Sequence, residues 1–249
     1  EQAPAGMEQK KEQKKELKCT EPSSILVTSP YWKQIFPEDS IEIIFNDNPP
    51  LCTFDILIFI LKNTNLTKYD LKEILVDNYL HYYTTYKFEI IQIFKLQGKH
   101  KMAKQLLLRK TTLSNIIMSE DYYATNLDLW ILIRHFKIPV IFISSTELVE
   151  NGKKFLVANR NTTANGSYYF IKSPGIKNDV ANVYRLIASP IYEIKIPLSA
   201  LSPDFVRDAN QANQANQANQ ENVIEDYLKK VSLMESTQRL RNKKVNLIV

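Results

Sequence analysis

The spacing of apolar and polar residues changes near the middle of the chain. Three segments of the first half predict amphipathic helices, because apolar residues recur there every three or four positions: 68–86, 87–96 and 101–113. The segment 52–61 is apolar at nearly every position and predicts a helix that is buried on all sides. Short strands are predicted at two apolar runs, 25–27 and 41–45. The first half is therefore predicted to be mostly helical, around one central buried helix.

The second half of the chain predicts a sheet. Residues 126–136 have the pattern of an amphipathic helix, and a continuous apolar run follows at 139–144. A helix that leads into a buried strand is typical of layered cores built from both elements. Three further strands are predicted between Asn-Gly and Pro-Gly turn signals, at 154–158, 168–172 and 192–196. We therefore predict an α+β protein in which the helical first half packs on a mostly antiparallel sheet.

The chain is predicted to divide into four parts. Residues 1–23 are predicted to be a flexible charged leader, because they offer almost no apolar side chain to bury. Residues 24–201 form the folded domain. Residues 202–221 are predicted to be a linker, because Ala-Asn-Gln repeats four times within them. Residues 222–249 predict a basic amphipathic helix that docks either on its own protein or on another chain or an acidic polymer.

Composition narrows the classes of function. Of the 249 residues 44% are hydrophobic, which is enough for a core, and the 5 glycines leave little material for phosphate-binding loops. The 2 cysteines and 3 histidines are too scattered for a zinc site, so we expect no metal and no cofactor. The low cysteine count favours a reducing compartment, and no apolar stretch is long enough to cross a membrane. We therefore expect a cytoplasmic protein with no membrane partner.

Cys52 is the candidate nucleophile. It stands at the start of the buried helix, where unpaired backbone N–H groups and the helix dipole favour a thiolate. A nucleophilic cysteine also needs a base, and His135 is the candidate. Its place at a helix end also suits a capping role, and the other two histidines, His81 and His100, lie in helical segments. The alternative is that Cys52 is an inert buried side chain.

The order of elements around Cys52 resembles the ovarian-tumour (OTU) family of papain-like cysteine proteases, which are deubiquitinases. Asp47 shortly precedes the cysteine, and the buried helix opens with Cys-Thr-Phe. The helix at 126–132 then runs into the strand at 138–143, as in that family. The resemblance implies an OTU-like, papain-like fold and makes ubiquitin a candidate partner.

The catalytic motif of the OTU family is incomplete in this chain. The family has Asp-Gly-Asn directly before the cysteine and an aromatic residue two positions after it. Phe54 matches the aromatic residue, whereas Pro50 and Leu51 stand in place of the Gly and Asn, and Asp47 lies two residues too far upstream. The family's histidine lies in a late strand, usually before an aromatic residue, and no histidine follows His135. The resemblance therefore implies a degraded active site.

Other stretches resemble long proteins encoded by nucleocytoplasmic large DNA viruses. The similar stretches are 122–130, 138–147, 150–153 and 168–176. The composition, rich in Lys, Asn and Ile, agrees with this resemblance. It implies that the chain is one part of a larger viral protein, located in a cytoplasmic virus factory or in a virion.

Basic residues and tyrosines support nucleic-acid binding as a further alternative, in a chain of net charge +5. The first basic run holds Lys99, Lys101, Lys104, Arg109 and Lys110. The C-terminal helix adds Arg239, Arg241, Lys243 and Lys244. Stacking surfaces for bases are predicted at Tyr82, Tyr83, Tyr86, Tyr122 and Tyr123. Basic runs on amphipathic helices are also common as plain solvated faces.

The sequence thus leads to one preferred hypothesis and two alternatives. The preferred one is a catalytically degenerate OTU-like domain that binds other protein subunits, in part through its C-terminal helix, within a larger viral assembly such as a transcription or virion complex. The first alternative is an active ubiquitin-directed thiol protease that uses Cys52 and His135. The second alternative is a nucleic-acid-binding module.

Overall fold

The computed structural model describes residues 22–45, 52–62, 65–144, 155–159, 166–173, 178–181 and 183–215, and it has the predicted α+β composition. The helices are α1 (Pro30–Lys33), α2 (Cys52–Leu61), α3 (Lys68–Leu96), α4 (His100–Leu107), α5 (Leu113–Met118), α6 (Asn126–His135) and α7 (Pro203–Ala215), with a 3-10 turn at Leu198–Ala200. The strands are β1 (Ser23–Leu26), β2 (Ile41–Ile44), β3 (Val140–Ser144), β4 (Phe155–Val157), β5 (Ser167–Ser173), β6 (Arg185–Ala188) and β7 (Ile196–Pro197).

The strands form one mixed sheet in the order β1-β2-β6-β5-β3-β4, and β7 pairs with β5. The β3–β5 pair is parallel, and the other described pairs are antiparallel, as the sequence predicts. β2 and β6 come from opposite ends of the domain, and Ile44 lies opposite Arg185 in their register. The sheet therefore combines residues from both halves of the chain, with β1 and β2 supplied by the mostly helical first half.

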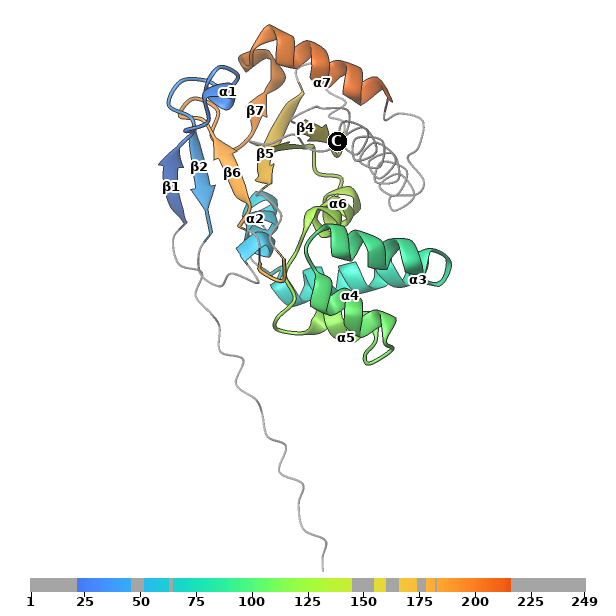
Figure 1. Ribbon diagram of the computed structural model, residues 1–249. Coiled ribbons are helices and arrows are strands. Elements are labelled where there is room, and N and C mark those ends of the chain that lie inside the picture. Colours follow the sequence, from blue (N-terminus) through green and yellow to red (C-terminus); the bar gives the residue numbers. More distant parts are fainter. Residues whose placement is uncertain are drawn as a thin grey trace, which may run out of the picture.

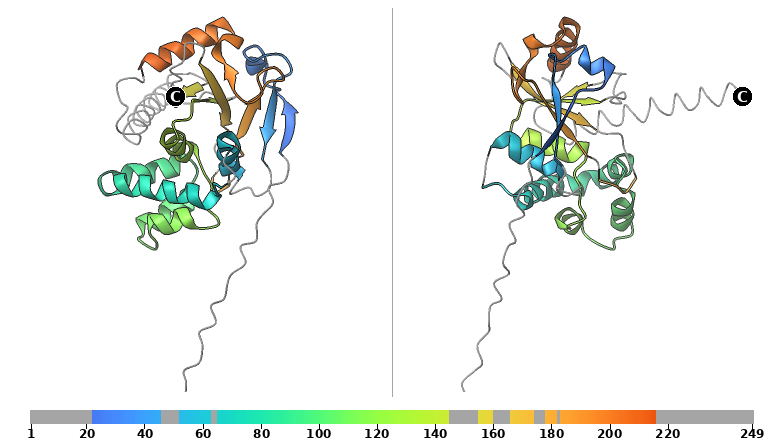
Figure 2. Two further views of the ribbon diagram at one scale, coloured as in Figure 1. Left: turned by 180° about the vertical axis from the view of Figure 1, so that it is seen from behind. Right: turned by 90° about the vertical axis from the view of Figure 1, so that its left-hand side faces the viewer.

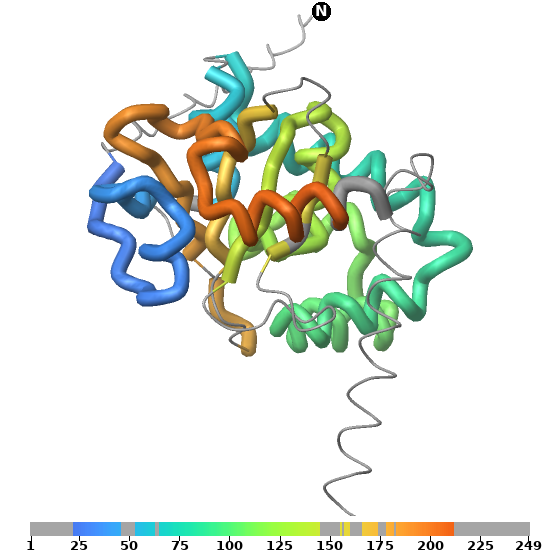
Figure 3. Tube along the Cα trace, turned by 90° about the horizontal axis from the view of Figure 1, so that it is seen from above, coloured from blue at the N-terminus to red at the C-terminus, as the bar shows by residue number. Residues whose placement is uncertain are grey.

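The sheet separates two apolar cores, so the protein has helices on both faces (Figure 1). Phe142, Ile171 and Leu186 belong to the larger core, with side chains of α2 to α6. Their neighbours in the strands point the other way, because side chains alternate along a strand, and they form the second core with α1 and α7. Figure 2 shows these layers from behind and from the side, and Figure 3 shows α7 lying across the sheet.

Local sequence signals explain where the long helices begin and bend. Thr67 is the N-cap of α3, and its backbone N–H donates to the Asp70 carboxylate at 2.7 Å while its hydroxyl accepts from the Asp70 N–H at 3.2 Å. The helix is interrupted at Tyr86, whose backbone is not helical. This is the boundary predicted between the segments 68–86 and 87–96, and that prediction is confirmed.

Two predicted elements are shorter than expected. The helix predicted at 101–113 ends at Leu107, because Arg109 adopts a left-handed backbone with φ of 52°, and Leu113 begins α5 instead. The strand predicted at 192–196 contributes only Ile196 to β7, because a turn with a positive φ at Glu193 occupies its first part. The prediction also missed β6.

α2 is a helix as predicted, although it is not buried on all sides. Phe54, Ile56 and Leu57 are completely buried in the larger core. Phe59 is partly exposed and packs against Phe45 at the end of β2, with ring centroids 5.4 Å apart. The helix thus lies between the sheet and the other helices, with one part of its surface open to solvent.

The predicted linker at 202–221 begins with a helix rather than an irregular spacer. Phe205 and Ala209 of α7 are buried in the second core, since residues four apart lie on one face of a helix. The leader, except for its last two residues, and the predicted helix at 222–249 lie outside the described residues. Among the helices that the structure describes, none has both the length and the apolar character needed to cross a membrane.

A buried ion cluster joins three central strands on the side of the second core. Glu42 of β2 is completely buried. Its carboxylate oxygens lie 2.5 Å from Lys172 Nζ of β5 and 2.5 Å from Arg185 Nη1 of β6. A buried carboxylate needs such partners, because an unpaired charge in the core is costly.

Candidate functional site

Cys52 is the first residue of α2, at the helix start that the sequence predicts. Its side chain lies outside the part that the structure describes. The residues that follow are firmly held, because Thr53 and Phe54 are buried and the Asp55 carboxylate pairs with Lys68 Nζ at 2.7 Å. The first turn of α2 is therefore anchored both to the core and to the start of α3.

The three histidines of the chain all lie in described helices. His81 is exposed on α3, and His100 begins α4 with its Nε2 atom 3.0 Å from the Asn178 side-chain oxygen. His135, the predicted base, is exposed at the last residue of α6, where its ring stacks edge-on with Phe136 at 4.9 Å. A strand histidine of the kind that the OTU family uses is therefore absent from this chain.

The segment before β6 and the end of β5 meet at the start of α6. Tyr184 is buried, and its hydroxyl donates to the Asn126 side-chain oxygen at 2.6 Å. The Ser173 hydroxyl donates to the same oxygen at 2.9 Å. Val183 precedes Tyr184 and packs against the larger core, which also contains Phe54 of α2. Two hydroxyls thus fix the N-terminal end of α6 to the place where β5 ends and β6 begins.

Four of the basic residues predicted to contact nucleic acid are exposed in and after α4: Lys101, Lys104, Arg109 and Lys110. The other four, Arg239, Arg241, Lys243 and Lys244, lie outside the described residues. The structure therefore keeps one basic surface available for binding.

Lys99, Tyr122 and Tyr123 do not belong to that surface, and their assignment to it is wrong. Lys99 and Tyr122 are completely buried, and Tyr123 is nearly so. For Lys99 and Tyr122 the reason is the Asp128 carboxylate, which was not predicted as a site residue and which binds both side chains in the core. The Tyr123 hydroxyl instead donates to the Gly98 carbonyl.

Asp128 is completely buried, and its carboxylate accepts hydrogen bonds from four residues. Its Oδ1 atom accepts from the hydroxyls of Tyr79 at 2.9 Å and Tyr122 at 2.5 Å. Its Oδ2 atom accepts from Lys99 Nζ at 2.6 Å and from the Thr125 N–H at 2.7 Å. One carboxylate therefore joins α3, the turn between α3 and α4, and the start of α6. We call these five residues the buried polar network.

Charge and aromatic rings stabilise Lys99 within the network. Its Nζ atom lies 4.1 Å from the ring centroid of Tyr122 and 4.6 Å from that of Phe94. Burial lowers the pKa of Lys99, and the adjacent Asp128 carboxylate opposes that effect. Burial and the negative charge of Asp128 raise the pKa of Tyr122 well above its usual value. The network is closed to solvent, so it supports the adjoining surface from inside the core.

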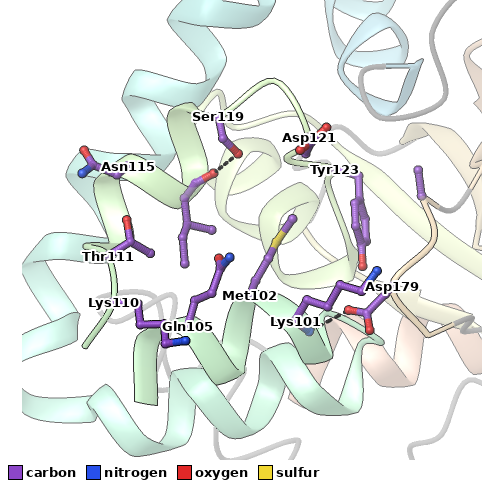
Figure 4. A pocket seen from close by; sticks show the side chains of 12 residues that line it. Lys101, Met102, Gln105, Lys110, Thr111, Asn115, Ser119, Asp121, Tyr123 and Asp179 are labelled. Atoms are coloured by element: carbon purple, nitrogen blue, oxygen red, sulfur yellow. Dashed lines mark hydrogen bonds between the residues drawn. The ribbon is translucent and has the colours of Figure 1, made fainter. Parts of the chain in front are cut away.

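A groove of about 550 Å³ lies next to this network, between α4, α5 and the loop at residues 178–181 (Figure 4). Its two ends differ in charge. Lys110, Thr111 and Asn115 gather at one end, and Asp121 and Asp179 lie at the other together with Lys101, so that the second end has a net formal charge of about −1.

The acidic end of the groove is fixed by hydrogen bonds to the turn before α4. The Asp179 N–H donates to the Gly98 carbonyl at 2.6 Å, and the Asp179 carboxylate accepts from the Lys101 N–H at 2.7 Å. The Tyr123 hydroxyl donates to the same carbonyl of Gly98 at 3.3 Å. Gly98 has a φ of 83°, a conformation that glycine adopts most easily. Because Lys99 follows Gly98 directly, the buried network also supports this end of the groove.

One sequence signal could have located the network in advance. Thr125 and Asp128 have the Thr-x-x-Asp spacing that marks a helix start, and Asp128 does bind the Thr125 N–H. No such signal predicts that Lys99, 29 positions away, pairs with Asp128 in the core.

The chain was compared with family models, with curated proteins and with solved structures, and nothing matches it in any of the three comparisons. In the described part of the chain, no three His, Cys, Asp or Glu side chains gather in a way that could hold a metal ion.

Proposed function

We propose that this chain is a catalytically degenerate OTU-like domain that serves as a protein-interaction module in a larger viral assembly. The observation that carries the proposal is Val183, an apolar residue directly before the buried Tyr184, which itself immediately precedes β6. The OTU family has a histidine before an aromatic residue in a late strand. An apolar side chain there cannot take a proton from a thiol.

The other candidate bases give Cys52 little support. A base must come within hydrogen-bond reach of the nucleophile, directly or through one water. The Tyr184 hydroxyl is already bound to Asn126. His135 lies at the opposite end of α6 from Asn126, and a helix of 10 residues is about 15 Å long. His135 is thus far from the edge of the sheet where Tyr184 meets α6.

The outer edge of the sheet supports a role in binding proteins. β1 is one of the two edge strands of the described sheet, and all four of its residues are exposed. Ile25 and Leu26 present apolar side chains, with no charged residue in the strand to block pairing. An edge of this kind can accept an extended strand from another protein.

A ubiquitin probe that carries a vinyl sulfone tests whether the site is degenerate. The probe forms a covalent bond only with a thiol that is activated in an assembled site. We expect the purified chain to remain unlabelled over hours, as does its Cys52→Ala variant. Rapid labelling of the native chain that disappears in Cys52→Ala would contradict the proposal and establish the ubiquitin-directed protease, with His135→Ala as the next variant to measure.

Substitution of Val183 tests the OTU-like arrangement itself. Val183→His introduces an imidazole directly before Tyr184, so we expect slow probe labelling that Cys52→Ala abolishes in the double variant. Val183→Leu is the matched control, because it keeps the site apolar. If Val183→His folds normally and stays unlabelled, Cys52 and the start of β6 are not neighbours, and the OTU-like arrangement is wrong.

A further inference from the structure

We propose that the groove between α4 and α5 binds a short peptide segment of a partner protein, with an acidic side chain at the Lys110 end and a basic side chain at the end formed by Asp121 and Asp179. This inference rests on the proposed function, because it names the kind of surface that the interaction module recognises. It also assigns a use to Lys110, one of the exposed basic residues after α4.

The size and lining of the groove suit a peptide. Its volume of about 550 Å³ falls within the range of about 300–1,000 Å³ that is usual for ligand sites. Met102 and Ile116 supply apolar contacts, and a methionine adapts its shape to different side chains. Gln105 and Asn115 each carry an amide with both donors and an acceptor, which matches the N–H and C=O groups of a peptide backbone.

The charges of the lining favour a peptide over a nucleic acid. Two lysines, Lys101 and Lys110, and two aspartates, Asp121 and Asp179, line the groove, so their formal charges cancel. A nucleic-acid strand repeats negative charges along its length and would bring phosphates close to both carboxylates. A peptide with one acidic and one basic side chain instead finds an opposite net charge at each end, because Asp121 and Asp179 outnumber Lys101 at the acidic end.

The acidic end is held in place before any ligand arrives. Asp179 is fixed by hydrogen bonds to Gly98 and to the Lys101 N–H, and the Gly98 carbonyl also accepts from Tyr123. Burial and the nearby Asp179 and Asp128 carboxylates raise the pKa of Tyr123 to about 12, so its hydroxyl stays neutral at physiological pH. Such a fixed end lowers the entropic cost of binding, since fewer groups must be ordered.

Fluorescence anisotropy with defined probes tests the inference on the full chain. Five fluorescein-labelled probes are titrated: two octapeptides with one Glu and one Lys in either order, separated by four neutral residues, one with two Glu, one with two Lys, and an eight-nucleotide oligothymidine. We expect both mixed-charge peptides to bind at least tenfold more tightly than the other three. Both orders of Glu and Lys are included because the inference does not specify in which direction the peptide backbone runs through the groove.

Charge-swapped variants identify the groove as the binding site. Lys110→Glu should weaken the mixed-charge peptides about tenfold, and Asp121→Lys should do the same. The double variant should recover most of the affinity, because the two ends of the groove again have net charges of opposite sign. Lys33→Glu on α1, on the other side of the sheet, is the control and should change nothing.

Three outcomes would overturn the inference. The first is that no probe binds, and the second is that the double variant binds no better than the single ones. The third is that the oligothymidine binds most tightly and loses affinity steeply with salt, which would identify a nucleic-acid site. None of these outcomes changes the vinyl sulfone assay, so failure of the groove and failure of the proposed function are seen separately.

Discussion

The buried pair of Lys99 and Asp128 allows a quantitative test of how the core is held together. Removal of either charge alone leaves the other charge inside the protein with fewer partners, whereas removal of both leaves none. We therefore consider Lys99→Met, Asp128→Asn and the double variant. Lys104→Met on the exposed side of α4 is the matched control.

The two single substitutions should differ in cost because the remaining partners differ. In Asp128→Asn, the Lys99 ammonium keeps the Tyr122 hydroxyl at 2.9 Å, the aromatic rings and at most a neutral amide oxygen, but it loses its only carboxylate partner in the described residues, so we expect a loss of about 3–5 kcal/mol in the free energy of unfolding. In Lys99→Met, the Asp128 carboxylate keeps hydrogen bonds from Tyr79, Tyr122 and Thr125. The cost should then be closer to that of one hydrogen bond to a charged group, about 1.5–3 kcal/mol.

The double variant is the decisive measurement. It has no buried charge at this position, so we expect it to lose no more than the Asp128→Asn variant, with a coupling energy of about 2 kcal/mol between the two sites. Urea unfolding followed by far-UV circular dichroism at pH 7 measures the four free energies. Lys104→Met should stay within about 0.5 kcal/mol of the native chain, as expected for an exposed side chain.

A different outcome would refute the reasoning. If the two single losses add in the double variant to within about 0.5 kcal/mol, the side chains do not act as a pair. If Lys99→Met costs as little as Lys104→Met, then Lys99 is not buried in solution. Either result would also contradict our inference that the network supports the turn before α4 and the groove.

Two further predictions concern other buried groups. Glu42→Gln should lower the free energy of unfolding by about 2 kcal/mol, because Lys172 and Arg185 lose the carboxylate charge that both contact. Substitution of an exposed glutamate, Glu38→Gln, is the control. Equal losses in the two variants would contradict the buried ion cluster. The pKa of Tyr123 is raised to about 12, so this residue contributes stability that is fully present below pH 10 and is lost as the pH rises through 12. The tyrosinate absorbance at 295 nm of the native chain and of Tyr123→Phe should therefore coincide up to about pH 11 and diverge only above it, whereas divergence near pH 10 would show an exposed hydroxyl.

The sequence predicts the elements of this protein better than its polar interior. The spacing of apolar residues and the continuous apolar runs locate α2, α6 and β3, because each of these elements packs its apolar side chains into the core. The interruption of α3 at Tyr86 also follows from a change in the pattern. β6 was missed although it is as long as β1 and β2. α7 was missed because the Ala-Asn-Gln repeats that continue it concealed the short apolar stripe of Phe205 and Ala209.

The candidate site was predicted only in part, because pairing across long sequence separations leaves no local pattern. Lys99 has the same residue type as its neighbours Lys101 and Lys104, and only the three-dimensional position of Asp128 makes it a core residue. Asp179 was likewise absent from the prediction. It reaches the groove because the connection between β5 and β6 returns to the start of α4, where Asp179 binds the Lys101 N–H.

The segment 122–130, one of the stretches that resemble viral proteins, supplies polar residues to the buried polar network. Tyr122, Thr125 and Asp128 each make buried hydrogen bonds within the network, and Asn126 binds the two hydroxyls at the edge of the sheet. The polar residues of this segment are thus required by packing, since a buried polar group without a partner is costly. A sequence similar to this segment would therefore share its packing, and the similarity alone would carry no information about catalysis. Catalysis is tested at the positions where an active OTU-like site needs a particular residue that packing alone does not require. These positions are Cys52 at the start of α2 and Val183 shortly before β6.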